Sequence, residues 1–387
     1  MAHSTITQQH SKIRDFRAIF ESSLLDIHNR TLLDPSECPN EDPPSSSHSQ
    51  RCVILSGGVD TCAILSAAKT INMKFAAAFT VVTSEDSPDL GFARACAAEH
   101  GIPHHVVTLN ADDLIAQFVP DVVRKLQIYN GALIRNSLVI AAVFRKASEM
   151  GFKDAIVGDG SDELFGGYSF MWGYEGDPAE WRKKRDGMCA EWTFSTEELA
   201  SMYGMRQHSP YLEKKMVDWA IENTEREDCI GVRDIRLMYG GKRMEHVTGK
   251  VILREAYDTV ASWRRKDPIE VGSGVTIVGH DSYWKDVISD EEFRAEKEEL
   301  LKRGFRMRDK ESLSYFRVFV EIFGPNGEEA EMNRLPMGEG CVDCCFDVGD
   351  KMFCHMCGAY PAQRSKAATH RYDYSVHKLV RKDGGQD

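Results

Sequence analysis

Short apolar runs alternate with helix-like segments between residues 51 and 157, and this alternation constrains the fold more than any other feature of the chain. The runs are "CVIL", "FAAAFTVV", "HHVVTL" and "DAIV", and the segments between them are rich in Ala, Leu and charged residues. Strands that alternate with helices of this length favour a parallel sheet with helices on both faces. Beyond about residue 177 the pattern is mostly helical. We therefore predict an α/β fold with a helical C-terminal part.

The composition limits what such a chain can do. Its 387 residues are 42% apolar, enough for a core of ordinary size, and its 48 Lys and Arg against 60 Asp and Glu leave a net charge of −12. A net negative charge disfavours a broad, sequence-independent grip on nucleic acid. The sequence has no apolar run of the roughly 18 to 20 residues that a membrane span needs, and no apolar secretory signal at its start. These features predict a cytoplasmic protein without a membrane segment.

Four segments of the sequence differ in composition and in the spacing of their apolar residues, and these differences predict the domain organisation. Residues 1–35 contain an amphipathic helix pattern over 11–33, and residues 36–50 form a Pro/Ser-rich linker. The alternating strands and helices, with the helical part that follows them, fill residues 51–335. Residues 336–387 include a cysteine cluster and predict a small separate module.

The stretch "CVILSGGVDT", residues 52–61, leads an apolar strand directly into a Gly-rich turn and a helix start. Unpaired backbone N–H groups and the positive end of the helix make such a turn an anion site. Gly57 and Gly58 let the main chain approach phosphate oxygens without an intervening side chain. Asp60 would repel a phosphate unless a cation lies between them, which implies Mg²⁺. The turn lacks the GK[ST] ending of a P-loop, and a plain strand-to-helix turn is the alternative interpretation.

A second loop, "VGDGSDELFGGY" over residues 157–168, also follows an apolar strand. Asp159, Asp162 and Glu163 place three acids within five residues, which suits a hard cation or a base, although a solvated acidic turn has the same composition. The carboxyl ends of neighbouring strands in an open parallel sheet share one crevice. Both loops can therefore face a single nucleotide.

Together the two loops resemble the synthetase domain of asparagine synthetases and β-lactam synthetases, within the PP-loop ATP pyrophosphatases, whose fold is adenine nucleotide α-hydrolase-like. The resemblance covers about residues 11–325 in the family's order and implies an asparagine synthetase-like PP-loop ATP-binding domain over 51–335. The further matching segments are "SPDLGFARACAAEHGIPHH" (87–105), "YNGALIRNS" (129–137), "SPYLEKKMVDWA" (209–220), "GKVILREAY" (249–257), "WRRK" (263–266) and "KESLSYFRVFVEIFGP" (310–325).

The resemblance implies ATP-dependent activation of a small carboxylate as an acyl-adenylate, release of pyrophosphate, and attack by ammonia or an amine. Asp60 and Asp162 would hold Mg²⁺, and Arg135 would lie near the pyrophosphate and the substrate. Lys250 matches the lysine that neutralises charge during adenylation. Asp159 matches the glutamate with which asparagine synthetases help deprotonate the incoming amine. The positions that would hold or lie near ATP are Ser56, Gly57, Gly58, Asp60, Thr61 and Gly158.

The departures from the family's pattern concern the nitrogen donor and the acceptor. Glutamine-using members begin with a cysteine nucleophile on a glutaminase domain, whereas fifty residues precede the first loop here and begin Met1-Ala2-His3. We therefore expect a glutamine-independent enzyme that uses ammonia, an amine substrate or a separate amidotransferase subunit. "VGDG" stands where the family reads SGEG, and His208 stands where it has an arginine, so aspartate is a doubtful substrate. A homodimer and an intramolecular amide remain open.

The C-terminal stretch "CVDCCFDVGDKMFCHMCGAYP" predicts a metal site. Two C-x2-C pairs separated by a short spacer suit a tetrahedral, structural Zn²⁺. Cys345 and His355 are further candidate ligands, and a redox dithiol or an Fe–S cluster are the competing interpretations. The four cysteines of the two pairs are Cys341, Cys344, Cys354 and Cys357.

The sequence thus predicts an ATP-dependent, AMP- and pyrophosphate-forming amide ligase, with ATP, Mg²⁺ and structural Zn²⁺ as its cofactors. One alternative is a PP-loop RNA-modifying enzyme, which the net negative charge disfavours. The other is a non-catalytic scaffold, against which the retained Asp60, Asp162 and Lys250 argue. The identities of the carboxylate and of the nitrogen donor stay open.

Overall fold

The computed structural model describes residues 2–32, 51–173, 176–331 and 333–363. The predicted linker over residues 36–50 lies outside the described residues. The chain divides into two compact units, the first formed by residues 1–114 and 139–275 and the second by 115–138 and 276–387. The bounds of these two units differ from those of the four predicted segments, and the domain organisation given by those segments stays a prediction. No helix in the described part of the chain combines the length and apolarity needed to cross a membrane.

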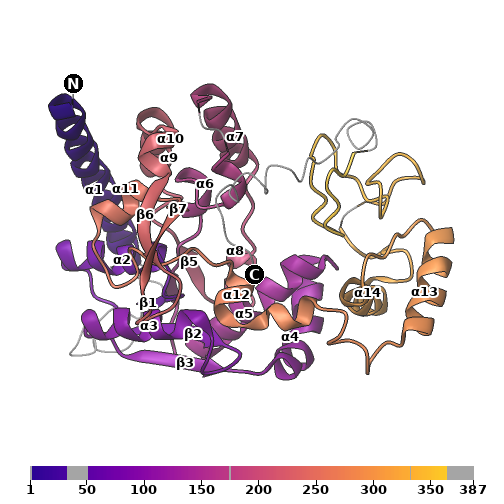
Figure 1. Cartoon of the computed structure of the whole chain (residues 1–387). Helices are drawn as coiled ribbons and strands as arrows, with labels where there is room; N and C mark the ends of the chain where they lie inside the picture. The colour runs from indigo at the N-terminus through magenta and orange to yellow at the C-terminus, as the bar shows by residue number, and fades with distance from the viewer. Residues whose placement is uncertain (1, 33–50, 174–175, 332, 364–387) are drawn as a thin grey trace. The chain divides into compact units, whose positions relative to one another are not determined.

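The first unit is built on a five-stranded parallel sheet (Figure 1). The strand order is β3-β2-β1-β4-β5, with β1 in the centre pairing Cys52 with Ala77 of β2 and with Ala155 of β4. Every residue of β2 is buried, as expected for a central strand of a parallel sheet. The strands are β1 (Arg51–Ile54), β2 (Ala77–Val82), β3 (His104–Thr108), β4 (Asp154–Ile156) and β5 (Arg206–His208).

Both faces of this sheet are covered, which confirms the predicted α/β fold. Val53, Ala78 and Ile156 share one core with helix α1 (Ala2–Leu32) and with the helices that follow β1 and β2. Residues of the opposite parity point the other way, and Phe79 packs edge-on against Phe152, with ring centroids 5.3 Å apart. The helix pattern predicted over residues 11–33 coincides with α1 as far as Leu32, and residue 33 lies outside the described residues. Its fully buried apolar residues are Phe16, Phe20, Leu24 and Ile27.

The first unit also contains an antiparallel hairpin, β6 (Gly231–Arg236) and β7 (Arg243–Thr248). The hairpin leads directly into α11 (Val251–Ala256), so it delivers Lys250 to the start of that helix. The other helices of this unit are α2 (Val59–Thr70), α3 (Pro88–Glu99), α6 (Ser161–Leu164), α7 (Pro178–Glu191), α8 (Thr196–Ser201), α9 (Lys214–Asn223), α10 (Arg226–Cys229) and α12 (Ile269–Ser273).

The second unit is helical and carries the cysteine-rich segment. Helices α4 (Ala111–Leu126) and α5 (Gly131–Glu149) begin or end in the first unit, and α13 (Asp290–Lys302) and α14 (Lys310–Phe323) lie wholly in the second. Helix α14 begins where the Asp309 side chain accepts a hydrogen bond of 2.7 Å from the backbone N–H of Ser312. The aromatic core of this unit consists of Tyr129, Phe305, Phe316, Phe319 and Phe323.

Candidate active site

The loop between β1 and α2 has the open backbone that the sequence predicts. Gly58 precedes the first residue of α2, and its N–H donates to Ser56 Oγ over 3.3 Å. Gly57 has a φ of 66°, and a Cβ at this position would lie 2.6 Å from both the Ala93 nitrogen and the Asp89 carbonyl oxygen. Only glycine fits such a position. The loop therefore reaches the start of a twelve-residue helix with an exposed Ser56 side chain and no bulky group in the way.

Arg264 stabilises this loop through hydrogen bonds, a role that the sequence analysis did not predict. Its Nη1 donates to the Gly57 carbonyl oxygen and its Nη2 to Asp89 Oδ1, each over 2.8 Å. The guanidinium group also lies 4.4 Å from the centre of the Phe92 ring. Burial raises the pKa of Asp89, and the charge of Arg264 opposes that shift. One buried arginine thus joins the Gly-rich loop to α3.

Arg264→Met should lower the free energy of unfolding by about 3 to 5 kcal/mol, because it leaves the buried Asp89 carboxylate without its partner. Urea unfolding of the full chain measures this change. Arg265→Met is the matched control, since Arg265 pairs with Asp267 from a side chain that is 43% exposed, and we expect it to cost no more than about 1 kcal/mol. Equal losses in the two variants would contradict the assigned role of Arg264.

Two lysines and two aspartates form a compact charge cluster beside the loop. Lys250 Nζ lies 2.6 and 2.7 Å from the two carboxylate oxygens of Asp60 and 2.9 Å from Asp162 Oδ1. Lys266 Nζ lies 3.1 Å from Asp162 Oδ2. The two ammonium groups balance the two carboxylates, so the cluster has no net charge. Lys266 belongs to the matched segment "WRRK", but nothing in its local sequence pointed to Asp162.

The backbone of Lys250 is in the left-handed region, with a φ of 60° and a ψ of 32°. For a residue other than glycine this conformation costs roughly 1 to 2 kcal/mol. A hydrogen bond of 2.9 Å from its N–H to the Phe165 carbonyl oxygen holds it in place, and its side chain is fully buried. The strained backbone directs the ammonium group between Asp60 and Asp162.

The second loop meets the first at this cluster. A Cβ on Gly158 would lie 2.9 Å from Asp60 Cβ, so the two Gly-rich loops are in contact. Ser161 Oγ donates to Asp60 Oδ1 over 2.8 Å. The two loops therefore share one site, as the position of both at the carboxyl ends of neighbouring strands predicts.

The donor set at the cluster fits Mg²⁺ that is bound together with phosphate. Mg²⁺ usually takes one or two carboxylates and completes its shell with substrate phosphates and water. Asp60 and Asp162 already bind the same cationic group, the ammonium of Lys250, so oxygens of both carboxylates converge on one point between them. Among the described residues no third acidic, thiol or imidazole side chain joins these two aspartates in a metal-sized group.

The acids of the second loop differ in their protonation. Burial opposes the ionisation of Asp162, but Lys250 and Lys266 outweigh it and hold its pKa at about 2. Burial, together with the charges of Asp162 and Asp60, raises the pKa of Asp159 to about 6, against a hydrogen bond that Thr196 Oγ1 donates to Asp159 Oδ2. Asp162 therefore serves as a permanent anion, whereas Asp159 gains and loses a proton near neutral pH.

Two further residues from the sequence analysis, Arg135 and His208, each pair with an acidic side chain. Arg135 belongs to the second unit, where its Nη1 lies 2.5 Å from Glu311 Oε2 in a buried ion pair. Burial raises the pKa of Glu311 to about 7, and Arg135 opposes that shift. His208 Nε2 lies 2.8 Å from Asp154 Oδ1, at the first residue of β4. Its side chain thus points to the opposite end of that strand from the loop that carries Asp159.

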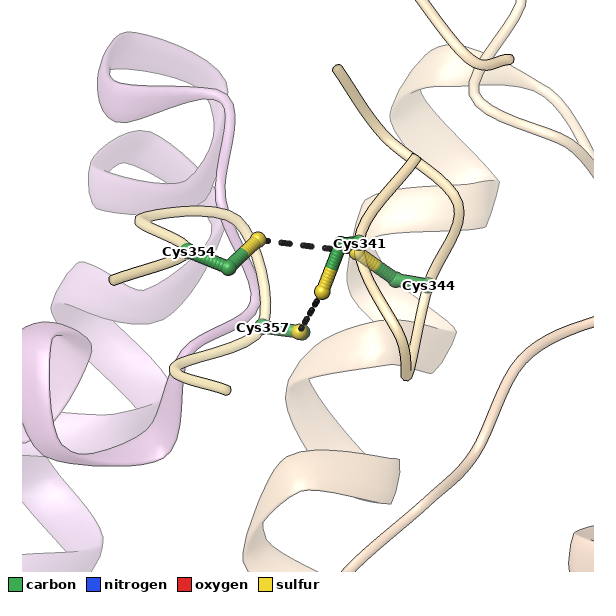
Figure 2. Close-up of side chains that lie close together, drawn as sticks. All are labelled: Cys341, Cys344, Cys354 and Cys357. Atoms are coloured by element: carbon green, nitrogen blue, oxygen red, sulfur yellow. Dashed lines mark hydrogen bonds between the residues drawn. The ribbon is translucent and has the colours of Figure 1, made fainter. Parts of the chain in front are cut away.

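The four cysteines of the two C-x2-C pairs converge in the second unit (Figure 2). The Sγ atoms of Cys341 and Cys357 are 3.7 Å apart, those of Cys344 and Cys354 are 3.6 Å apart, and all four lie within 4.8 Å of one another. The edge of a tetrahedron with zinc–sulfur bonds of about 2.3 Å is about 3.8 Å. The four thiols are therefore spaced like the ligands of a tetrahedral zinc ion.

The other two candidate ligands are outside this cluster. Cys345 has a φ of 60°, and its Sγ lies 3.7 Å from the Gly304 carbonyl oxygen. The His355 ring packs edge-on against Phe353. Neither side chain belongs to the metal-sized group of described residues.

Comparison with known proteins shows a similarity to one family. Residues 46–227 match the family model described as asparagine synthase. The chain is 28% identical over 254 residues to a probable glutamine-hydrolysing asparagine synthetase of Dictyostelium discoideum, covering 62% of this chain and 43% of that one. It is 26% identical over 302 residues to asparagine synthetase B of Escherichia coli (strain K12), covering 70% and 50%. The chain thus spans about half the length of the curated relatives it matches.

Among solved structures, a predicted subunit of a tRNA methyltransferase from Methanocaldococcus jannaschii is 14% identical, and the match covers 56% of this chain and 93% of that one. Its TM-score is 0.26, so it carries no argument about function. The parallel sheet and the two Gly-rich loops are consistent with the family that the sequence relatives indicate. Residues 46–227 are thus similar to the asparagine synthase family.

Proposed function

We propose that this protein is an ATP-dependent, AMP- and pyrophosphate-forming amide ligase that activates a small carboxylate as an acyl-adenylate for attack by ammonia or an amine. The observation that carries the proposal is the charge cluster of Lys250, Asp60, Asp162 and Lys266, placed where two Gly-rich loops meet. The asparagine synthetases that the chain is similar to support the reaction class.

The loop Ser56–Gly58 would receive the pyrophosphate end of ATP on its backbone N–H groups, with Thr61 beside it at the start of α2. Asp60 and Asp162 would hold Mg²⁺, which supplies positive charge to the phosphate oxygens. The ammonium of Lys250, released from the two carboxylates, would then neutralise the charge that develops as the carboxylate attacks the α-phosphorus. Lys266 would stay on Asp162 and keep that carboxylate ionised and in position.

Asp159 is the residue we propose to accept the proton of the incoming nitrogen nucleophile. A base with a pKa of about 6 is mostly ionised at neutral pH and still binds a proton readily. Thr196 orients the carboxylate through its hydroxyl, and Ser209 Oγ fixes the backbone by donating to the Asp159 carbonyl oxygen over 2.7 Å.

Thr196→Val should shift the acid limb of the pH profile for amide formation to higher pH. The Thr196 hydrogen bond lowers the pKa of Asp159, so its removal raises that pKa and leaves less base at a given pH. At pH 6 we expect a rate about three- to tenfold below that of the parent chain, with little difference at pH 8. Thr70→Val, on the exposed end of α2, is the control. An unshifted profile would argue against Asp159 as the base.

We also propose that Cys341, Cys344, Cys354 and Cys357 bind one structural Zn²⁺. Four buried thiols leave no open coordination position for a substrate or water, which is the pattern of a structural site. Fixed to the protein by four bonds, the ion would order a segment that has little regular secondary structure of its own.

The decisive experiment is pyrophosphate exchange into ATP with a panel of amino and other carboxylic acids. Exchange that depends on one acid supports the ligase. Product analysis with ammonia, an amine or glutamine in separate reactions then identifies the nitrogen donor and tests the predicted independence from glutamine. Turnover of ATP that requires RNA and no carboxylic acid would overturn the proposal, as would the absence of ATP binding in calorimetry.

A further inference from the structure

The second C-x2-C turn of the cysteine cluster rests on the residues that start α5. Tyr129 donates its N–H to the Met356 carbonyl oxygen over 3.0 Å, and a Cβ on Gly358 would lie 2.8 Å from Asn130 Nδ2. The Tyr129 ring packs edge-on against Phe316 of α14, with centroids 5.0 Å apart. Figure 2 shows this turn, with Cys354 and Cys357, facing the turn that carries Cys341 and Cys344.

The hydroxyl of Tyr129 is buried among the thiols. Within the described part of the chain it makes no hydrogen bond of standard geometry, and it interacts with the Cys344 thiol. A buried hydroxyl without an acceptor is rare in proteins, and a metal-bound thiolate accepts such a hydrogen bond readily. Tyr129 is thus a donor placed for the ligated form of the cluster.

Arg308 holds the same turn from the start of α14. Its Nη1 donates to the Gly358 carbonyl oxygen over 3.0 Å, and its Nη2 donates to the Cys357 carbonyl oxygen. Arg308 directly precedes Asp309, whose side chain caps the start of α14. The turn is therefore attached to the starts of two helices.

These two helix starts carry the Arg135–Glu311 ion pair. Arg135 lies in the second turn of α5, and Glu311 is the second residue of α14. The pair has no room to shift, since a Cβ on Gly131 would lie 2.8 Å from Glu311 Oε2 and one on Gly279 would lie 2.2 Å from Arg135 Nη1. Arg135 Nε is buried and has no hydrogen-bond partner among the described residues.

We propose that Tyr129 and Arg308 couple metal occupancy of the cysteine cluster to the geometry of the Arg135–Glu311 pair, so that the metal site positions a substrate-binding arginine. The inference rests on the proposed ligase only in taking Arg135 to contact the substrate. The cluster is then a positioning device for two helix starts as well as a local fold element. Without the metal, the turn that carries Cys357 and Gly358 loses its fixed shape, and both helix starts lose their common support.

The test compares zinc-loaded Arg308→Gln with Arg306→Gln in the full chain. Arg306 is the matched control, because its side chain is 62% exposed and lies 3.7 Å from Asp343. Arg308→Gln should retain the metal, while the amides of residues 132–138 exchange their hydrogens roughly tenfold faster. The parent chain stripped of metal should show the same acceleration. Unchanged exchange at these amides in both samples would overturn the coupling, whatever reaction the protein catalyses.

Tyr129→Phe tests the donor to the thiolate separately. We expect a metal affinity lower by about tenfold in competition with a chelator, with Tyr257→Phe in the first unit as the control. Equal affinity would remove Tyr129 from the coupling. Kinetics test the last link: Arg308→Gln should raise the KM for the carboxylate about tenfold and leave the KM for ATP unchanged. Faster amide exchange with an unchanged carboxylate KM would overturn the link to substrate binding.

Discussion

Lys250→Met should lower the rate of pyrophosphate exchange into ATP by about 10³-fold or more. The substitution keeps a long side chain but removes the buried ammonium group that lies between Asp60 and Asp162. Loss of one preorganised charge at the point where negative charge develops typically costs 10²- to 10³-fold, that is about 3 to 4 kcal/mol. Here the loss also leaves two carboxylates facing each other without their shared cation, so we expect the upper end of this range.

Two further measurements on Lys250→Met separate a chemical defect from a misfolded protein. Thermal unfolding in the presence of Mg²⁺ should show a larger stabilisation of the variant than of the parent chain, because a divalent cation can now bind between the two carboxylates without ATP. Lys69→Met, at the exposed end of α2, should retain full exchange. Full exchange in Lys250→Met would contradict the assignment of this cluster as the site of adenylation.

Removal of zinc should unfold the cysteine-rich segment, with an expected loss on the order of 10 kcal/mol of metal-binding free energy. We expect one zinc ion per chain by elemental analysis and none in Cys357→Ser. The melting temperature of the second unit should fall strongly in this variant and in the chelated parent chain, as measured by calorimetry.

Cys345→Ser is the control for the zinc prediction, because Cys345 is buried and neighbours Cys344 but lies outside the four-thiol group. It should retain the metal and unfold close to the parent temperature. A loss of metal in Cys345→Ser equal to that in Cys357→Ser would mean that the ligand set is different from the one proposed.

The features that were predictable from the sequence depend on contiguous residues. The Gly-rich turn at Gly57 follows its strand directly, and the parallel sheet follows from the alternation of apolar runs with helical segments. The spacing within and between the two C-x2-C pairs is read directly from the sequence, so the four-thiol group could be predicted without knowledge of the tertiary structure. In each case the physical cause acts over a few residues.

The features that were missed depend on contacts between distant residues. Arg264 reaches the Gly57 carbonyl oxygen across 207 positions, and its sequence context resembles that of a surface arginine. Lys266 forms an ion pair with Asp162, and no pattern in the sequence around either residue predicts this pair. Glu311 was part of a matched segment, but its pairing with Arg135 depends on how α5 and α14 pack. Only the tertiary structure brings these charges together.

The Lys250 ammonium, which Asp60 and Asp162 share, would also affect the release of product. An enzyme that binds pyrophosphate through Mg²⁺ must also let it go, and two bare carboxylates left behind would repel each other and hold the metal back. Lys250 can return to both carboxylates as the product departs. In this structure its ammonium binds both oxygens of Asp60 and the Oδ1 atom of Asp162, while Lys266 binds Asp162 Oδ2. In the proposed reaction, the side chain that stabilises the developing charge would thus also ease the release of pyrophosphate, because its return neutralises both carboxylates.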